Sequence, residues 1–215
     1  VGPLDEFIQQ VITEERVPQR TSRDRPRLNI LFTGHRHSLN LLRSRPRPYT
    51  EKLTPPRLAD ATRGKPWVSD FHISTRPAEV EDRAVPGHWE GDLVIGKGNA
   101  SAIITLVERH SRYVMLGALP HSQVSDEVVD VLTGLMARLP GELTKTLTWD
   151  QGSEMARHAR FTLASNCRVF FCDPHSPWQR GSNENTNGLL RQYFPKGTTD
   201  FRTITQDDLD AVARE

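Results

Sequence analysis

The sequence predicts an α/β fold in which a mixed sheet of five strands is flanked by helices. Two observations support this prediction. From residue 86 onward, three strand-like segments follow one another with short turns between them, and apolar residues then alternate between helical and strand-like spacing. The 215 residues include 36% apolar side chains, enough for one domain of ordinary size plus an extension.

The first three strands are predicted over 89–95, 102–108 and 113–119. The connecting segments, 96–99 and 109–112, hold glycine or polar residues of the kind found in turns. Neighbouring strands joined by such short connections pair antiparallel. We therefore expect an antiparallel meander.

A helix is predicted to start with Ser125 as its N-cap, with Asp126 and Glu127 complementing the helix dipole. Apolar residues recur at helical spacing until Pro140 and Gly141 end it. The remaining elements are a strand over 144–149, a helix over 153–164, a strand over 168–172, a helix over 183–194 and a last helix capped by Thr205. This is the element order of a ribonuclease H-like fold, although other mixed-sheet domains share it.

The first 75 residues differ from the rest in composition. Between Arg16 and Lys65 there are 13 Lys or Arg and three acidic residues, a local charge of +10 in a chain whose net charge is +1. Beyond a short helix expected over 4–17, Pro and Arg dominate, which predicts a basic, poorly structured extension over 1–75 and a folded domain over 76–215. A solvated arm and a nucleic-acid contact fit this charge equally well.

Several function classes are excluded by what the chain contains. Cys167 and Cys172 are its two cysteines and no signal-peptide pattern opens it, which predicts a protein of the reducing cytosol. No apolar run approaches the roughly 20 residues that cross a bilayer, so no membrane partner is expected. A Gly-rich phosphate loop is missing, so no dependence on ATP is expected.

Two aspartates occupy informative positions on predicted strands. Asp92 lies inside the first strand, where alternation places it on the same face as Glu90 and opposite Trp89. A buried, unpaired carboxylate costs several kcal/mol, so Asp92 needs a cation or a hydrogen-bond network. Asp150 ends the fourth strand, where α/β folds keep their sites. Taken singly, a salt-bridged strand residue and a turn residue explain them as well.

Glu184 lies on the predicted helix over 183–194 and shares a face with Asn187 and Arg191, away from an apolar stripe that includes Leu189 and Tyr193. A solvated helix surface is the ordinary explanation for one such residue. Together with Asp92 and Asp150, however, it offers the hard oxygen ligands that hold two Mg²⁺ or Mn²⁺ about 3.5–4 Å apart at phosphoryl-transfer sites.

Three segments carry long and specific motifs: GHWEGDL at 87–93, TWDQGSEMARH at 148–158 and DPHSPWQRGSNENTNGLLRQYFPKGT at 173–198. They resemble the catalytic core of bacterial insertion-sequence transposases of the IS-thirty family, from about Arg76 to the C-terminus. The resemblance implies a DDE-type integrase core with Asp92, Asp150 and Glu184 as the catalytic, metal-binding triad. The 33 residues between Asp150 and Glu184 agree with that family's spacing.

The same resemblance implies a transposase, dependent on Mg²⁺ or Mn²⁺, that cuts element ends and joins the freed 3′-hydroxyl to target DNA. Its implied partners are double-stranded DNA, both terminal inverted repeats and target, and further copies of itself, in the bacterial cytoplasm at the nucleoid. Arg191 stands seven residues after Glu184, where such enzymes carry a basic residue that contacts DNA. The further expected DNA contacts are Trp178, Gln179, Asn187 and Lys196.

The chain also departs from the family. Its relatives carry an N-terminal helix-turn-helix region that residues 1–75 do not clearly show, and they continue beyond Glu215, so we expect a C-terminally truncated core. Two alternatives therefore remain open. One is a truncated, non-catalytic remnant that binds DNA, and the other, with less support, is a ribonuclease H-like nuclease without strand transfer.

Overall fold

The computed structural model describes residues 5–9, 66–119, 121 and 123–215. Five strands form one mixed sheet: β1 (His88–Ile95), β2 (Ala102–Glu108), β3 (Val114–Leu119), β4 (Thr146–Trp149) and β5 (Arg168–Phe171). Their order across the sheet is β3-β2-β1-β4-β5. The first three pair antiparallel, and β4 and β5 add in parallel beside β1. This is the predicted ribonuclease H-like sheet, including its meander.

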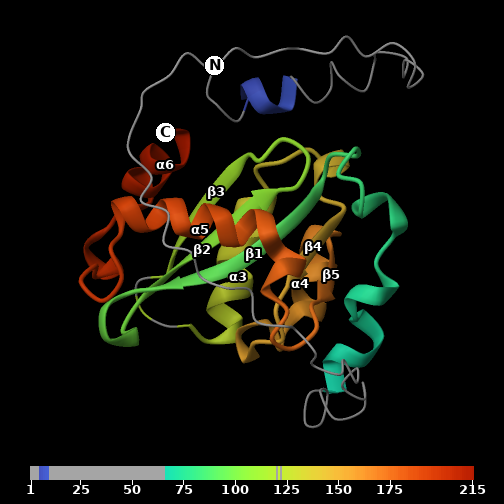
Figure 1. Cartoon of the computed structure of the whole chain (residues 1–215), viewed down its shortest axis with the longest axis horizontal. Coiled ribbons are helices and arrows are strands. Elements are labelled where there is room, and N and C mark those ends of the chain that lie inside the picture. Colours follow the sequence, from blue (N-terminus) through green and yellow to red (C-terminus); the bar gives the residue numbers. More distant parts are fainter. Residues whose placement is uncertain (1–4, 10–65, 120, 122) are drawn as a thin grey trace, which may run out of the picture.

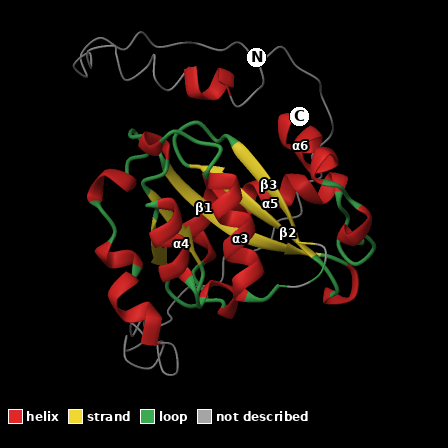
Figure 2. Ribbon diagram, turned by 180° about the vertical axis from the view of Figure 1, so that it is seen from behind, coloured by secondary structure: helices red, strands yellow, loops and turns green. Residues whose placement is uncertain are grey.

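Helices cover both faces of the sheet (Figures 1 and 2). On one face α3 (Ser125–Met136) and α4 (His158–Ser165) pack over an apolar core that includes Trp89, Leu132 and Phe161. On the other face α5 (Gly181–Tyr193) and α6 (Gln206–Arg214) cover a smaller core built around Val94 and Leu190. The fold is therefore a three-layer α/β arrangement with the sheet in the middle.

Side chains of β1 alternate between these two cores, as predicted. Trp89, Leu93 and Ile95 belong to the core under α3 and α4, whereas Val94 belongs to the core under α5 and α6. Asp92 therefore lies on the face that α5 covers. The alternation places the candidate catalytic strand residue and the helix that carries Glu184 on the same side of the sheet.

Two sequence predictions about helix ends are wrong. Ser125 is not the N-cap of α3; Val124 holds the extended cap conformation, and the Ser125 hydroxyl instead accepts a hydrogen bond from the Arg157 amide at 2.9 Å. The helix predicted over 153–164 is divided into a short 3₁₀ turn (Ser153–Met155) and α4, because Arg157 leaves the helical backbone region (φ −99°, ψ 25°). The Thr205 cap of α6 is confirmed, since its side chain and that of Asp208 form a capping box.

Residues just before the predicted domain start pack on the folded core. Two 3₁₀ helices, Pro66–Phe71 and Ile73–Thr75, precede it, Val68 is fully buried, and His72 forms an isolated parallel bridge with Phe171 of β5. The boundary near residue 75 stays a prediction. Most of the basic extension lies outside the described residues; of the helix predicted over 4–17, residues 5–9 are helical.

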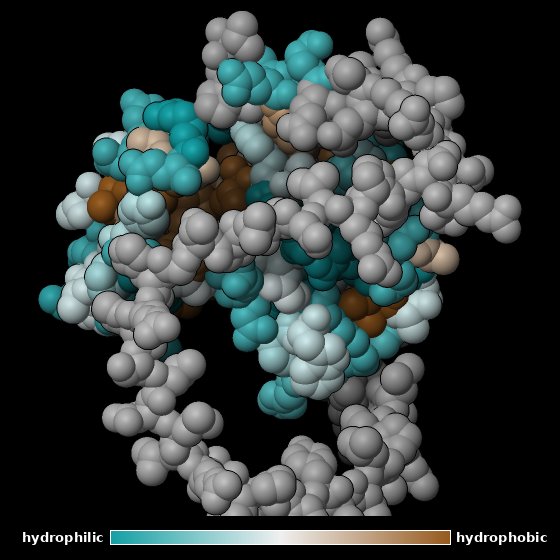
Figure 3. Space-filling view, turned by 45° about the horizontal axis from the view of Figure 1, so that its top comes forward, coloured by the Kyte–Doolittle hydropathy of each residue, from teal (hydrophilic) through white to brown (hydrophobic). Residues whose placement is uncertain are grey.

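The described surface exposes few large apolar side chains. In the view of Figure 3, hydrophobic residues appear in small patches among hydrophilic ones. Cys167 and Cys172 are both buried, unpaired thiols, and burial raises the pKa of each to about 12. Among the described residues no helix has the length and apolar character to cross a membrane.

Candidate active site

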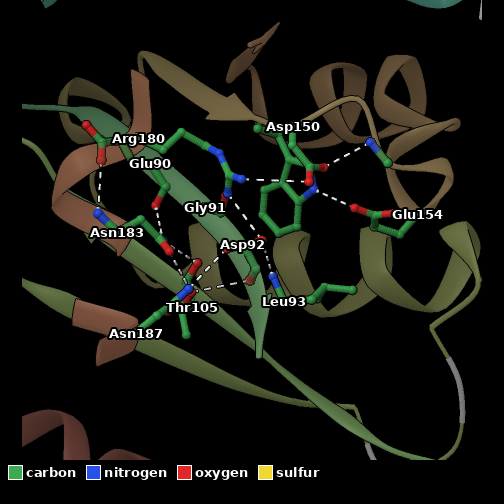
Figure 4. A network of polar contacts seen from close by, with 12 residues as sticks. Glu90, Gly91, Asp92, Leu93, Thr105, Asp150, Glu154, Arg180, Asn183 and Asn187 are labelled. Carbon is green, nitrogen blue, oxygen red and sulfur yellow. Dashed lines mark hydrogen bonds and ion pairs between the residues drawn. The ribbon is translucent and has the colours of Figure 1, made fainter. Parts of the chain in front are cut away.

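Asp92 and Asp150 lie on neighbouring strands and face a common cation. β4 pairs in parallel with β1, and Asp150 follows the last residue of β4. The guanidinium of Arg180 lies 3.2 Å from Asp92 Oδ1 and 3.7 Å from Asp150 Oδ2, and it donates a 2.8 Å hydrogen bond to the carbonyl oxygen of Gly91 (Figure 4). Three residues from separate parts of the sequence thus form one charged cluster.

Burial shapes the electrostatics of this cluster. The side chain of Arg180 is 12% exposed, that of Asp92 30% and that of Asp150 45%. Burial raises the pKa of Asp92, and the Arg180 guanidinium opposes that rise. Burial also works against the charge on Arg180, but Asp92 and Asp150 outweigh it and raise the pKa of the guanidinium. The cluster therefore holds one permanent positive charge between two carboxylates.

A third carboxylate, Glu154, lies beside Asp150. Its Oε1 accepts a 3.0 Å hydrogen bond from the Trp149 indole. Burial raises the pKa of Glu154; the indole opposes this rise, and the Asp150 carboxylate adds to it. Gly152 allows this approach, because a Cβ there would lie 1.9 Å from Glu154 Oε1. The short Asp-Gln-Gly-Ser-Glu turn thus folds a second acid back toward Asp150.

Gly91 matters in the same way on β1. A Cβ at this position would lie 2.3 Å from the Trp149 ring. The absence of a side chain lets the Trp149 ring pack against the strand at this position, while the Gly91 carbonyl oxygen accepts the hydrogen bond from Arg180. The glycine in the first motif therefore serves the packing of the two strands that carry the aspartates.

A buried polar network attaches α5 to the sheet. Glu90 is fully buried and forms an ion pair with Arg109, which also donates to the Val80 carbonyl oxygen at 3.0 Å. The Glu90 carboxylate accepts a 3.0 Å hydrogen bond from the backbone amide of Asn183 in the first turn of α5. The Asn183 side chain donates to the carbonyl oxygens of Glu90 and Thr105. These bonds position the start of the helix that carries Glu184.

The structure brings part of the predicted helix face to the site. Asn187 donates a 3.1 Å hydrogen bond to Asp92 Oδ2, and Arg191 donates to the carbonyl oxygens of Ile95 and Phe194. Glu184, one turn before Asn187, is exposed, and within the described part of the chain its side chain makes no hydrogen bond or ion pair. Its contact with the two aspartates stays a prediction.

The predicted apolar stripe of α5 is wrong in part. Leu189 and Tyr193 are 54% and 46% exposed, whereas Asn183 is fully buried and faces the sheet with Leu190. The physical reason is that the sheet face beneath α5 buries Glu90 and needs hydrogen-bond donors there. A hydrophobicity pattern cannot predict which face of a helix is buried when that face is polar.

The remaining predicted DNA contacts lie in different settings. Trp178 is 71% exposed, and Lys196 is also exposed. Gln179 is already engaged, since its side chain exchanges two hydrogen bonds with Asp173, of 2.7 and 2.8 Å. Trp178 and Gln179 line a cavity of about 470 Å³ together with Arg76, Arg83 and Arg109.

The carboxylate oxygens of the candidate site suit a hard cation, but the structure brings together two of the three predicted metal ligands. Asp92 and Asp150 supply carboxylate oxygens, which Mg²⁺ and Mn²⁺ prefer, and the guanidinium of Arg180 already demonstrates that a cation fits between them. In the described residues, no three His, Cys, Asp or Glu side chains come together as a metal-binding group. A fit to the predicted metals is thus supported by two ligands.

Sequence reasoning missed Arg180, Glu154 and the Glu90–Arg109 pair. The signal for Glu90 was present, because alternation placed it on the same buried face as Asp92. Arg180 and Glu154 lie in short turns whose conformation depends on tertiary contacts, so their positions had no sequence signal beyond membership of the motifs.

The chain is similar to a known protein family and to named transposases. The integrase core domain family matches residues 82–177, which include Asp92 and Asp150. The transposase for insertion sequence element IS1086 of Cupriavidus metallidurans is 51% identical over 164 residues, covering 76% of this chain and 47% of that protein. The transposase InsI for insertion sequence element IS30A of Escherichia coli is 52% identical over 148 residues, covering 69% of this chain and 38% of that protein.

A likeness to solved structures is weaker. A chain in the cryo-electron microscopy structure of the simian T-cell lymphotropic virus intasome, in complex with a PP2A regulatory subunit, matches with a TM-score of 0.47 and 23% identity. The match covers 60% of this chain and 47% of that chain.

Together the sheet topology and the family match define the class of this chain: it contains an integrase core domain. Its high identity to the two transposases defines the family more closely. The chain belongs to the IS30 family of insertion-sequence transposases, named IS-thirty above. It spans less than half the length of these two relatives.

Proposed function

We propose that this chain is the catalytic core of a DNA transposase, which cuts insertion-element ends and joins the 3′-hydroxyl to target DNA by two-metal phosphoryl transfer. The observation that carries the proposal is the pair of aspartates on adjacent strands, Asp92 and Asp150, sharing one cation. The relatives named as transposases support the reaction class. The proposed setting is the bacterial cytoplasm at the nucleoid.

The proposed roles follow from position. Asp92 and Asp150 would hold Mg²⁺ or Mn²⁺, and Glu184 would complete the ligand set from the first turn of α5. When bound, such cations make an attacking water or hydroxyl more acidic and stabilise charge on the scissile phosphate. Asn187 orients Asp92 through its 3.1 Å hydrogen bond to Oδ2, which keeps the other carboxylate oxygen directed to the Arg180 side.

The proposed DNA contacts lie before α5 and toward its C-terminal end. Trp178 offers an exposed ring for stacking, next to the cavity that Arg76 and Arg83 line. Arg191 lies in the last turn of α5 and Lys196 follows the helix, and their charges would position the phosphate backbone. Gln179 needs to release Asp173 before it contacts DNA. An active complex would contain several copies of the chain on two element ends.

The experiment measures Mg²⁺-dependent cleavage and joining of duplexes that carry the terminal repeats of the related IS1086 and IS30A elements. We expect Asp150→Asn to lower the rate by about 10²–10³-fold or more, the loss typical when one stabilising group leaves a reacting centre. Asp126→Asn is the matched control. It removes an aspartate in the first turn of α3 that pairs with two surface arginines, and it should leave the rate unchanged.

The outcomes separate the candidate functions. Undiminished cleavage by Asp150→Asn would contradict the assignment of this aspartate. Steeply salt-dependent DNA binding without cleavage by the wild-type chain would favour a non-catalytic remnant. Degradation of an RNA–DNA hybrid without strand joining would favour a ribonuclease H-like nuclease.

A further inference from the structure

Arg180 places a positive charge where the proposed function needs a divalent cation. Its Nη1 and Nη2 lie within ion-pair distance of Asp92 and Asp150, respectively. The residue belongs to a 3₁₀ turn (Pro177–Arg180) and is also the N-cap residue of α5, with a non-helical backbone (φ −124°, ψ 41°). The charge therefore enters the site from the junction between this turn and the helix that carries Glu184.

The contacts of Arg180 are those of an exchangeable cation rather than of a fully satisfied structural one. Its Nε is buried and has no hydrogen-bond partner among the described residues. The 3.7 Å separation from Asp150 is too long for a hydrogen bond, and the 2.8 Å bond to the Gly91 carbonyl is the shortest contact recorded for the guanidinium. A buried polar group without a hydrogen-bond partner is unfavourable, which reduces the cost for Arg180 of leaving this position.

We infer that Arg180 is a resident counter-cation of the carboxylate pair, which neutralises Asp92 and Asp150 in the metal-free chain and is displaced from them when divalent cations bind. This inference rests on the proposed function, because it assumes that the two aspartates are metal ligands. It assigns Arg180 as a positioning residue that keeps the two carboxylates together until the cations arrive.

The sign of the effect follows from electrostatics. Arg180 cannot lose its charge, because a guanidinium is effectively always protonated. A divalent cation that binds the carboxylates therefore meets a like charge at ion-pair distance, and this repulsion weakens its binding. Removing Arg180 removes this competition, so metal affinity should rise. A merely structural residue would do the opposite, because its loss would displace the carboxylates.

The experiment measures Mn²⁺ binding to the purified chain at pH 7.5 by electron paramagnetic resonance, together with the melting temperature with and without Mn²⁺. We expect Arg180→Gln to bind Mn²⁺ about tenfold more tightly than wild type, given the charge removed at this distance. We also expect it to melt at a lower temperature without Mn²⁺ and to gain more from added Mn²⁺. Arg160→Gln is the matched control, since Arg160 also bridges two aspartates, Asp126 and Asp130, but on an exposed surface.

Each outcome has a distinct meaning. Weaker or unchanged Mn²⁺ binding by Arg180→Gln would overturn the inference. If Arg180→Gln does not fold, Arg180→Lys and Arg180→Met replace it. Lysine keeps the positive charge without the planar guanidinium, so the Mn²⁺ affinity of Arg180→Lys should stay within about threefold of wild type. The Mn²⁺ affinity of Arg180→Met should be higher than that of wild type. Loss of Mn²⁺ binding in Asp150→Asn together with no effect of Arg180→Gln would contradict this inference alone. Unchanged binding in Asp150→Asn would contradict the proposed metal site itself.

Discussion

The two faces of the sheet are built from different kinds of contact. Under α3 and α4, the sheet buries large apolar side chains such as Trp89, Leu132 and Phe161. Under α5, the same strands bury Glu90 and Thr105, which bond to Asn183 of the helix, and partly bury Asp92, which accepts a hydrogen bond from Asn187. β1 contributes to both faces by alternation alone.

The difference shows that one face of the sheet mainly stabilises the domain, whereas the other mainly positions the helix that covers the candidate site. Apolar burial on the α3 face stabilises the domain in proportion to area and tolerates small shifts. Hydrogen bonds and the ion pair on the α5 face depend on direction, so they fix the helix in one position relative to Asp92. The candidate site lies on the face whose contacts are directional.

The largest effect on stability is expected from a substitution on the polar face of the sheet, under α5. Glu90→Gln leaves Arg109 buried without its counter-charge and should lower the free energy of unfolding by about 3–5 kcal/mol. Leu132→Ala, its counterpart on the apolar face, should cost about 2–5 kcal/mol by leaving a cavity. Urea unfolding measures both losses.

Metal affinity distinguishes the two variants. We expect Mn²⁺ to bind the folded Leu132→Ala variant as it binds wild type, and to bind Glu90→Gln more weakly, because α5 loses an anchor next to Asp92. Equal Mn²⁺ affinities for the two variants would show that the polar network adds stability without placing the site.

A smaller loss of stability is expected when the pH is lowered. His88 lies on β1, fully buried beside Thr146 at 2.8 Å, and burial lowers its pKa to about 4. In the unfolded chain His88 has an ordinary histidine pKa near 6.5, so between pH 6.5 and pH 4 it binds a proton that it does not bind in the folded chain. The contribution of His88 to the free energy of unfolding is therefore complete at pH 7 and decreases as the pH falls toward 4. The expected loss from His88 is about 2 kcal/mol between pH 7 and pH 5.

Unfolding free energies measured across this pH range check the prediction. His88→Asn should show a shallower dependence on pH, whereas His175→Asn should keep the wild-type dependence, because His175 is exposed and its left-handed backbone (φ 57°) tolerates asparagine. Equal slopes for wild type and His88→Asn would contradict the account of His88.

The smallest expected effect concerns α6, at the edge of the α5 face. Thr205→Ala removes the side chain that accepts from the Asp208 amide and should lower the free energy of unfolding by about 1 kcal/mol. Because α6 lies away from the carboxylates, Mn²⁺ affinity should not change. A change in affinity would show that the two helices on this face act as one unit.

Much of the fold could be predicted because it depends on local periodicity. β2 has the predicted bounds, 102–108, and alternation placed Asp92 on the correct face. The predictions failed where a tertiary contact decides. Ser125 bonds to Arg157 instead of capping its helix, and the buried face of α5 is polar because Glu90 lies beneath it. The contact of Arg180 with two aspartates joins three distant segments, which no local pattern encodes.

The central claim is that Asp92 and Asp150 together bind the divalent cation. Anomalous diffraction from crystals of the chain grown with Mn²⁺ tests it most directly. The account predicts an anomalous peak at bonding distance from a carboxylate oxygen of each aspartate, with the Arg180 guanidinium moved away from both. A structure with Mn²⁺ bound elsewhere, and with Arg180 still between the two aspartates, would contradict it.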